Sequence, residues 1–189
     1  RNELDKIKPV FMLAEASESY FHSAFDMTYA WQLKDIMNDI AKGNKDAKDI
    51  AEFVEEEKME YPSDAYRMLF TTNHDENSWN GTVFERLGES AEMFAVLIST
   101  LDGMPLVYSG QEVGLDKRLD FFERDPIIWK SHAFEDLFAK LFQLKLNNRA
   151  LWNGNFGGDV ELIESGINEN TFSFFRKKGD DMIVALFNL

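Results

Sequence analysis

The chain has 189 residues and a net charge of −14, from 34 Asp and Glu against 20 Lys and Arg. That charge argues against a nucleic acid or an anionic membrane as partner, and no apolar run approaches the ~20 residues that span a bilayer. The absence of cysteine excludes disulfides and thiol catalysis, while 44% hydrophobic residues indicate a globular fold.

The first part of the chain alternates short apolar runs with helical patterns. Residues 9–14 predict a buried strand, and residues 23–28 predict a second short strand that reaches Asp26. Apolar side chains then recur at helical spacing over residues 30–41, and a further helical stretch opens at Asp46.

The same alternation continues through the middle of the chain. Residues 66–70 form an apolar run that predicts a strand, and residues 89–101 predict a helix that ends before a glycine and a proline. Residues 104–108 predict the next strand, and an amphipathic helix with apolar residues from 134 to 144 follows. Strands and helices alternating at this spacing predict parallel βα units, hence an α/β fold.

The composition changes at Trp152. Glycines punctuate the chain from there, and short apolar runs separated by turn residues replace the helical patterns. This pattern predicts antiparallel β structure. We therefore expect two domains, an α/β part over residues 1–151 and the start of an all-β domain over residues 152–189.

Two of the predicted parallel strands end in carboxylates, at Glu15 and at Asp75. Because the carboxyl ends of parallel strands meet at one edge, these groups are candidates for joint acid-base work on a ligand. Cleavage of a glycosidic bond needs such a pair, one carboxyl protonated and the other ionised. The apolar residues before Glu15 indicate a partly apolar setting, which favours the protonated form. Alternatively, Glu15 is a solvated strand end, and His74 and Asp75 cap the next helix.

Three segments carry a resemblance to a known family. Residues 11–16 (Phe-Met-Leu-Ala-Glu-Ala), 70–75 (Phe-Thr-Thr-Asn-His-Asp) and 104–112 (Met-Pro-Leu-Val-Tyr-Ser-Gly-Gln-Glu) resemble the ends of strands five, seven and eight of the α-amylase family of glycoside hydrolases. The resemblance implies the second half of a (β/α)8 TIM barrel, followed by a partial antiparallel β domain. It covers nearly the whole chain.

The resemblance also implies roles for individual side chains. Glu15 corresponds to the general acid/base and Asp75 to the residue that distorts and stabilises the substrate, while His74 binds a sugar hydroxyl. Further candidates for substrate binding are Asn73, Trp79 and Gln111. Trp79 is either a sugar platform or a cover for the barrel rim, and Gln111 either lines the pocket or orients Asp75. The expected substrate is an α-glucan such as starch or a maltooligosaccharide.

The family's nucleophile aspartate and its neighbouring arginine lie on the fourth strand, which this chain does not contain. We therefore expect the chain alone to be inactive and to hold no cofactor. Calcium in the full-length parent is an open prediction. An α-glucosidase, a transglycosylase and a non-catalytic sugar- or protein-binding relative are the alternatives. The chain begins at Arg1 without a methionine, so we expect a piece of a longer protein, and its compartment cannot be predicted.

A half-barrel would leave two open sheet edges and an uncovered apolar face. Unpaired strand edges and large apolar patches favour association with other chains. We therefore expect the isolated chain to associate with itself as a dimer, or else to be poorly ordered.

Overall fold

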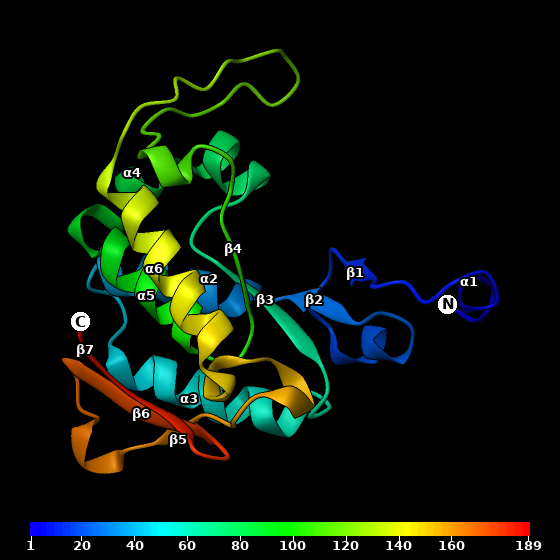
Figure 1. Cartoon of the computed structure of the whole chain (residues 1–189). Helices are drawn as coiled ribbons and strands as arrows, with labels where there is room; N and C mark the ends of the chain where they lie inside the picture. The colour runs from blue at the N-terminus through cyan, green and yellow to red at the C-terminus, as the bar shows by residue number, and fades with distance from the viewer.

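The computed structural model describes all 189 residues and contains two sheets (Figure 1). The parallel sheet has the order β1-β2-β3-β4, and the antiparallel sheet has the order β5-β6-β7. The strands are β1 (Leu13–Ala14), β2 (Met27–Tyr29), β3 (Tyr66–Phe70), β4 (Met104–Leu106), β5 (Glu161–Leu162), β6 (Thr171–Lys178) and β7 (Asp181–Asn188).

Six α-helices accompany the strands. They are α1 (Asn2–Asp5), α2 (Trp31–Ala41), α3 (Ala47–Glu60), α4 (Val83–Leu87), α5 (Ala91–Thr100) and α6 (Ala133–Asn147). Helix α3 begins at a capping box in which Asp46 and Asp49 satisfy each other's backbone N–H groups. None of the helices is long and apolar enough to cross a membrane.

The parallel sheet is apolar on both faces, one packed against helices and the other forming a smaller cluster of strand side chains. In β3, Leu69 points into a large core built with helices α2, α3, α5 and α6, whereas Met68 and Phe70 point into a smaller cluster on the other face with Met27 and Tyr29. The four parallel strands, the helices between them and the separate antiparallel sheet confirm the predicted fold class, a half-barrel followed by a partial β domain.

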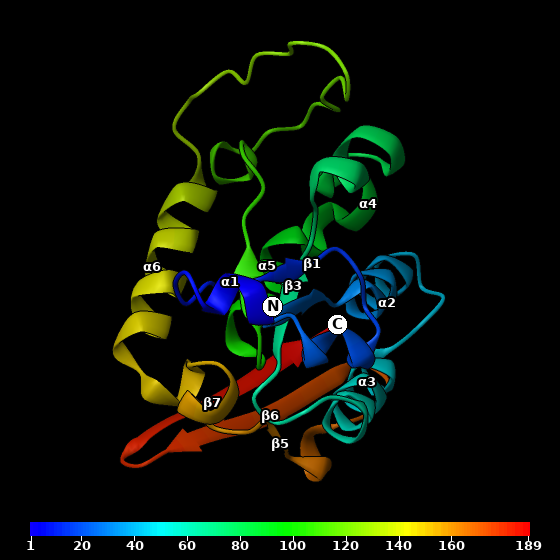
Figure 2. The same ribbon diagram turned by 90° about the vertical axis from the view of Figure 1, so that its right-hand side faces the viewer.

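The antiparallel sheet shares its core with the helices. Phe172, Phe174 and Phe187 are buried in the same cluster as the apolar faces of α3 and α5, and Figure 2 shows β5–β7 lying at one end of the molecule beside α3 and α6. The domain boundary near Trp152 stays a prediction.

A buried arginine joins the antiparallel sheet to the loop between α5 and β4. Arg176 of β6 is completely buried and donates to the backbone oxygens of Leu101 (2.8 Å), Gly158 (2.7 Å) and Trp152 (2.7 Å). Its guanidinium also pairs with the carboxylate of Asp102 at 3.2 Å. A buried charge is tolerated when its donors are all used in this way.

Two predicted elements have different boundaries. The strand predicted over residues 23–28 is β2, which begins only at Met27. Asp26 lies just before it, and its carboxylate accepts the backbone N–H of Met12 at 2.7 Å. The helix expected over residues 89–101 is α5, and it is preceded by α4, which begins at a capping box of Thr82 with Glu85.

A cavity of about 620 Å³ opens at the end of the sheet where β3 and β4 begin. Its walls are mainly apolar, and Lys145 of α6 is a charged exception. The Lys145 ammonium donates to the backbone oxygen of Leu151 at 2.6 Å. Burial, reinforced by the positive charge of Arg176, lowers the pKa of Lys145 to about 7.

This shift makes stability depend on pH. In the unfolded chain Lys145 keeps its proton up to its ordinary pKa of 10.5, so between about 7 and 10.5 the unfolded state binds more protons and the free energy of unfolding rises with pH. We expect Lys145→Met to remove this rise and Lys140→Met, an exposed change on the same helix, to keep it. Urea unfolding at pH 6 to 10 measures both, and equal slopes in the two variants would contradict the assignment.

Candidate active site

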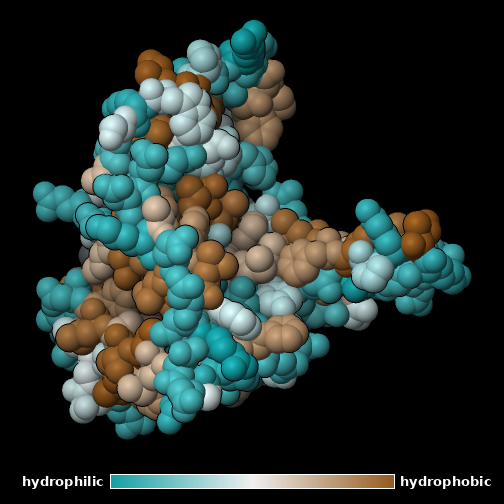
Figure 3. Space-filling view, viewed as in Figure 1, coloured by the Kyte–Doolittle hydropathy of each residue, from teal (hydrophilic) through white to brown (hydrophobic).

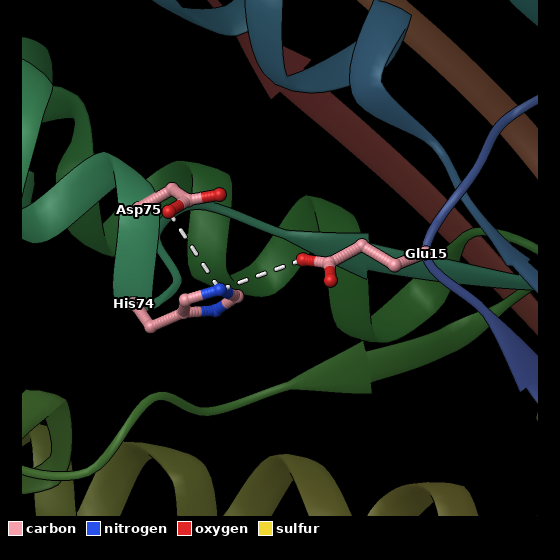
Figure 4. A group of neighbouring side chains, drawn as sticks. All are labelled: Glu15, His74 and Asp75. Atoms are coloured by element: carbon pink, nitrogen blue, oxygen red, sulfur yellow. Dashed lines mark ion pairs between the residues drawn. The ribbon is translucent and has the colours of Figure 1, made fainter.

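The two carboxylates predicted to meet do lie at the same edge of the parallel sheet. Strands β1 and β3 both pair with β2 in parallel, so Glu15, directly after β1, and the turn that follows β3 project from the same side. Figure 4 shows the carboxyl groups of Glu15 and Asp75 both pointing towards the same ring nitrogen of His74.

The distances define a compact group of three side chains. The Nε2 atom of His74 lies 3.5 Å from Oε1 of Glu15 and 3.7 Å from Oδ1 of Asp75. One oxygen from each carboxyl and the His74 nitrogen all lie within 4.8 Å of one another. We call Glu15, His74 and Asp75 the strand-end triad.

The strand-end triad is open to solvent. The side chains of Glu15, His74 and Asp75 are 54%, 44% and 40% exposed. The expected apolar setting of Glu15 is therefore wrong in this chain, because Phe11 and Leu13 before it are themselves exposed instead of surrounding its carboxyl.

A tyrosine that the sequence did not indicate also lies in this region. Tyr29 ends β2, the strand between those that carry Glu15 and Asp75. Burial, reinforced by the negative charges of Glu15 and Asp75, raises the pKa of the Tyr29 phenol, which stays a hydrogen-bond donor in neutral solution. The strand predicted over residues 23–28 stopped one residue before Tyr29.

Asn73 and Gln111 lie inside the structure and do not face the open triad. Asn73 is buried, and its side-chain oxygen accepts the backbone N–H of Glu76 at 2.8 Å, which shapes the turn that carries His74 and Asp75. The buried amide of Gln111 donates to the hydroxyl of Thr71 at 2.7 Å. Both side chains thus fix the end of β3, and their contact with substrate stays a prediction.

A buried network of charged side chains contacts the turn that carries His74 and Asp75. Glu76 is only 4% exposed, and its carboxylate accepts from Lys34 of α2 at 3.0 Å and from Asn80 at 3.1 Å. The guanidinium of Arg86 in α4 lies 3.8 Å from the other carboxylate oxygen of Glu76. It also donates to the Thr71 backbone oxygen at 2.7 Å. Nothing in the local sequence separates Glu76 from an ordinary surface glutamate, so its role required the structure.

Trp79 lies near the strand-end triad, and the ring of Phe121 lies between them. It is exposed, and its ring centroid is 5.1 Å from that of Phe121, which in turn is 5.9 Å from the His74 ring. Trp79 therefore reaches the triad through Phe121, a residue of the long loop after β4.

The arrangement suits acid-base chemistry on a polar substrate. The Glu15 and Asp75 oxygens lie within 4.8 Å of each other, close enough for both carboxyl groups to contact one bound unit of such a substrate. Two carboxylates and an imidazole are also the ligand types of a small divalent ion.

Comparisons with known proteins point to one family. The family model described as the alpha amylase catalytic domain matches residues 4–154. Alpha-amylase MalA of Haloarcula japonica is 34% identical over 156 residues, covering 77% of this chain and 21% of that protein. Alpha-amylase 2 of Dictyoglomus thermophilum is 22% identical over 179 residues, covering 87% of this chain and 30% of that protein.

Solved structures share the fold. The maltogenic alpha-amylase AmyB of Thermotoga neapolitana superposes with a TM-score of 0.84 at 24% identity, covering all of this chain and 44% of that one. A cyclic alpha-maltosyl-(1→6)-maltose hydrolase of Arthrobacter globiformis, solved with that sugar, superposes with a TM-score of 0.77 at 20% identity, covering 97% of this chain and 42% of that one.

The four parallel strands and their helices form half of a (β/α)8 barrel, and the family model matches most of the chain. The chain belongs to the α-amylase family. It spans less than half the length of each of these four relatives.

The buried Lys34–Glu76 pair yields a test of stability. Because Lys34→Met leaves the buried Glu76 charge without its nearest partner, we expect a loss of about 3 kcal/mol in the free energy of unfolding. Lys48→Met, which breaks the exposed 3.4 Å pair with Glu169, should cost at most about 1 kcal/mol. Urea denaturation of both variants measures the difference, and equal losses would show that the Glu76 network is not what holds the turn.

Proposed function

We propose that this chain supplies the acid/base and substrate-stabilising groups of a retaining glycoside hydrolase that acts on α-glucosidic bonds of starch or maltooligosaccharides. The convergence of Glu15, His74 and Asp75 at one edge of a parallel sheet carries the proposal. Membership of the α-amylase family supports the choice of an α-glucan as substrate.

The three side chains have distinct tasks in this reaction. The protonated carboxyl of Glu15 donates its proton to the glycosidic oxygen as the bond from that oxygen to the anomeric carbon breaks, and later accepts a proton from the attacking water. The carboxylate of Asp75 faces the positive charge that develops at the anomeric carbon. His74, between the two carboxylates, hydrogen-bonds a hydroxyl of the same sugar.

The chain alone does not complete this cycle. Retention proceeds through a covalent ester between the anomeric carbon and a second carboxylate. The family resemblance places that nucleophile on the strand before Glu15, and residues 1–12 include no such strand. We therefore propose that hydrolysis by these 189 residues is negligible, and a calcium ion in the full-length parent stays a prediction.

Asp75→Ala separates an assembled site from an unassembled one. We expect the native chain to bind maltoheptaose more tightly than the variant does, because the variant loses the hydrogen bonds of the Asp75 carboxylate, each worth about 1.5–3 kcal/mol. Calorimetric titration measures the affinity, and a reducing-sugar assay should find no hydrolysis by either protein. Equal weak binding by both would contradict the proposed site, and hydrolysis that Asp75→Ala abolishes would contradict the proposed inactivity.

We further propose that the isolated chain forms a dimer. Strands β1 and β4 are the outer strands of the parallel sheet and leave unpaired edges, and β7 presents Met182, Val184 and Leu186 to solvent. Light scattering at several protein concentrations should give twice the mass of one chain. The mass of one chain at all concentrations, together with well-protected strand amides, would contradict self-association.

A further inference from the structure

The cavity where β3 and β4 begin lies at the opposite end of the parallel sheet from the strand-end triad, which follows the last residues of its strands. Its volume of about 620 Å³ is in the range of about 300–1,000 Å³ that small-molecule sites occupy. Aromatic side chains from three parts of the chain line it: Phe11 and Tyr66 beside the sheet, Phe142 of α6, and Trp152 and Phe156 after α6. We call this space the aromatic cavity.

Two polar side chains also line the aromatic cavity, and each has hydrogen-bonding capacity left. Lys145 of α6 donates to the backbone oxygen of Leu151 at 2.6 Å, and its amino group keeps at least one further N–H in either protonation state. The Oδ1 atom of Asn153 is shielded from solvent and has no hydrogen-bond partner in the protein. A buried polar atom without a partner is unfavourable, so a ligand that supplies the partner gains affinity.

The two polar side chains select the polar group of the ligand. A hydroxyl both donates and accepts, so it satisfies Oδ1 of Asn153 and the free N–H of Lys145 together. A carboxylate only accepts, which leaves the Asn153 oxygen unpaired beside a negative charge. Lys145 does not compensate for this, because burial lowers its pKa to about 7 and the amine is largely uncharged at pH 8.

The walls of the cavity select the body of the ligand. Flat aromatic molecules pack against aromatic side chains in offset or edge-to-face arrangements. A sugar carries a hydroxyl on nearly every carbon, and most of these would lose their hydrogen bonds to water against such walls. The cavity is accessible from solvent, because Leu146 and Phe156 in its lining are 67% and 64% exposed. Figure 1 shows α6 beside β4, and in Figure 3 hydrophobic residues reach the surface in the same region.

We propose that the aromatic cavity is a binding site for a phenol, a compact aromatic molecule with a hydroxyl group on its ring. The ring packs against the aromatic walls, and the hydroxyl donates to Oδ1 of Asn153 and accepts a hydrogen bond from Lys145. This site uses none of the residues of the strand-end triad, so it is independent of the proposed hydrolysis of α-glucans.

The test is a titration of the native chain at pH 8 with p-cresol, toluene and p-toluate, followed by NMR through the indole signal of Trp152. The three molecules share a methyl-substituted ring, which carries a hydroxyl in p-cresol, no polar group in toluene and a carboxylate in p-toluate. We expect p-cresol to bind at least about three-fold more tightly than the other two, because it alone completes both hydrogen bonds. Equal or tighter binding of toluene or p-toluate, or no saturable binding of p-cresol, would overturn the proposal.

Asn153→Ala tests the polar contact separately from the walls. We expect this variant to bind p-cresol about five-fold more weakly, through the lost hydrogen bond, and to bind toluene as the native chain does. Asn155→Ala is the matched control, because Asn155 is exposed two residues further on and does not line the cavity. Equal p-cresol affinity in the two variants, or an equal loss for p-cresol and toluene in Asn153→Ala, would overturn the assigned contact.

Two other occupants of the cavity give different results in the same titration. If a second copy of the chain covers the cavity, the affinity for p-cresol falls as the chain is concentrated. If the cavity binds glucan, maltoheptaose displaces p-cresol. We expect the affinity for p-cresol to depend neither on the concentration of the chain nor on maltoheptaose, and either dependence would overturn the proposal.

Discussion

The parallel pairing of β1, β2 and β3 is the constraint on which the rest of this structure depends. Glu15 and Asp75 are separated by almost a third of the chain, and no local interaction brings them together. They meet because both strands pair with β2 in the same direction, which sends their carboxyl ends to one edge. Once there, the two carboxyl groups both approach the Nε2 atom of His74, close enough to act on a single sugar. The proposed chemistry is therefore a consequence of sheet topology, and the side chains only supply the reacting groups.

Two buried charges maintain this geometry from opposite ends of the molecule. Near the site, Glu76 is compensated by Lys34 and lies directly after Asp75, so the backbone of the triad is tied to helix α2. At the other end, Arg176 binds the backbone oxygens of Leu101 and Gly158, which joins the antiparallel sheet to the loop that precedes β4. Each network is costly to break because it would leave a buried charge without a partner. Neither touches a substrate, so substitutions there act on the position of the site and on folding.

The sequence predicted the alternation of strands and helices well, because buried parallel strands and amphipathic helices have distinct periodicities. Glu15 and Asp75 could be found because Glu15 follows an apolar strand directly and Asp75 lies in the polar turn after another. The inward direction of Gln111 could not be found, since its partner lies 40 residues away on another strand end. Helix α4 was detectable, because Thr82 and Glu85 have the spacing of a capping box. The approach of Phe121 to the triad depends on side-chain contacts between distant segments, for which no local pattern exists.

The absence of cysteine in this chain allows the most direct measurement of the central claim, that the ends of β1 and β3 meet. Glu15 and Asp75 are replaced together by cysteine and labelled with pyrene maleimide, and a second protein carries the label at Glu15 and at Met59, which is exposed on helix α3. Excimer fluorescence that persists on dilution into an excess of unlabelled chain reports contact within one molecule. We expect it for the Glu15 and Asp75 pair alone, and its absence from that pair in folded protein would contradict the account.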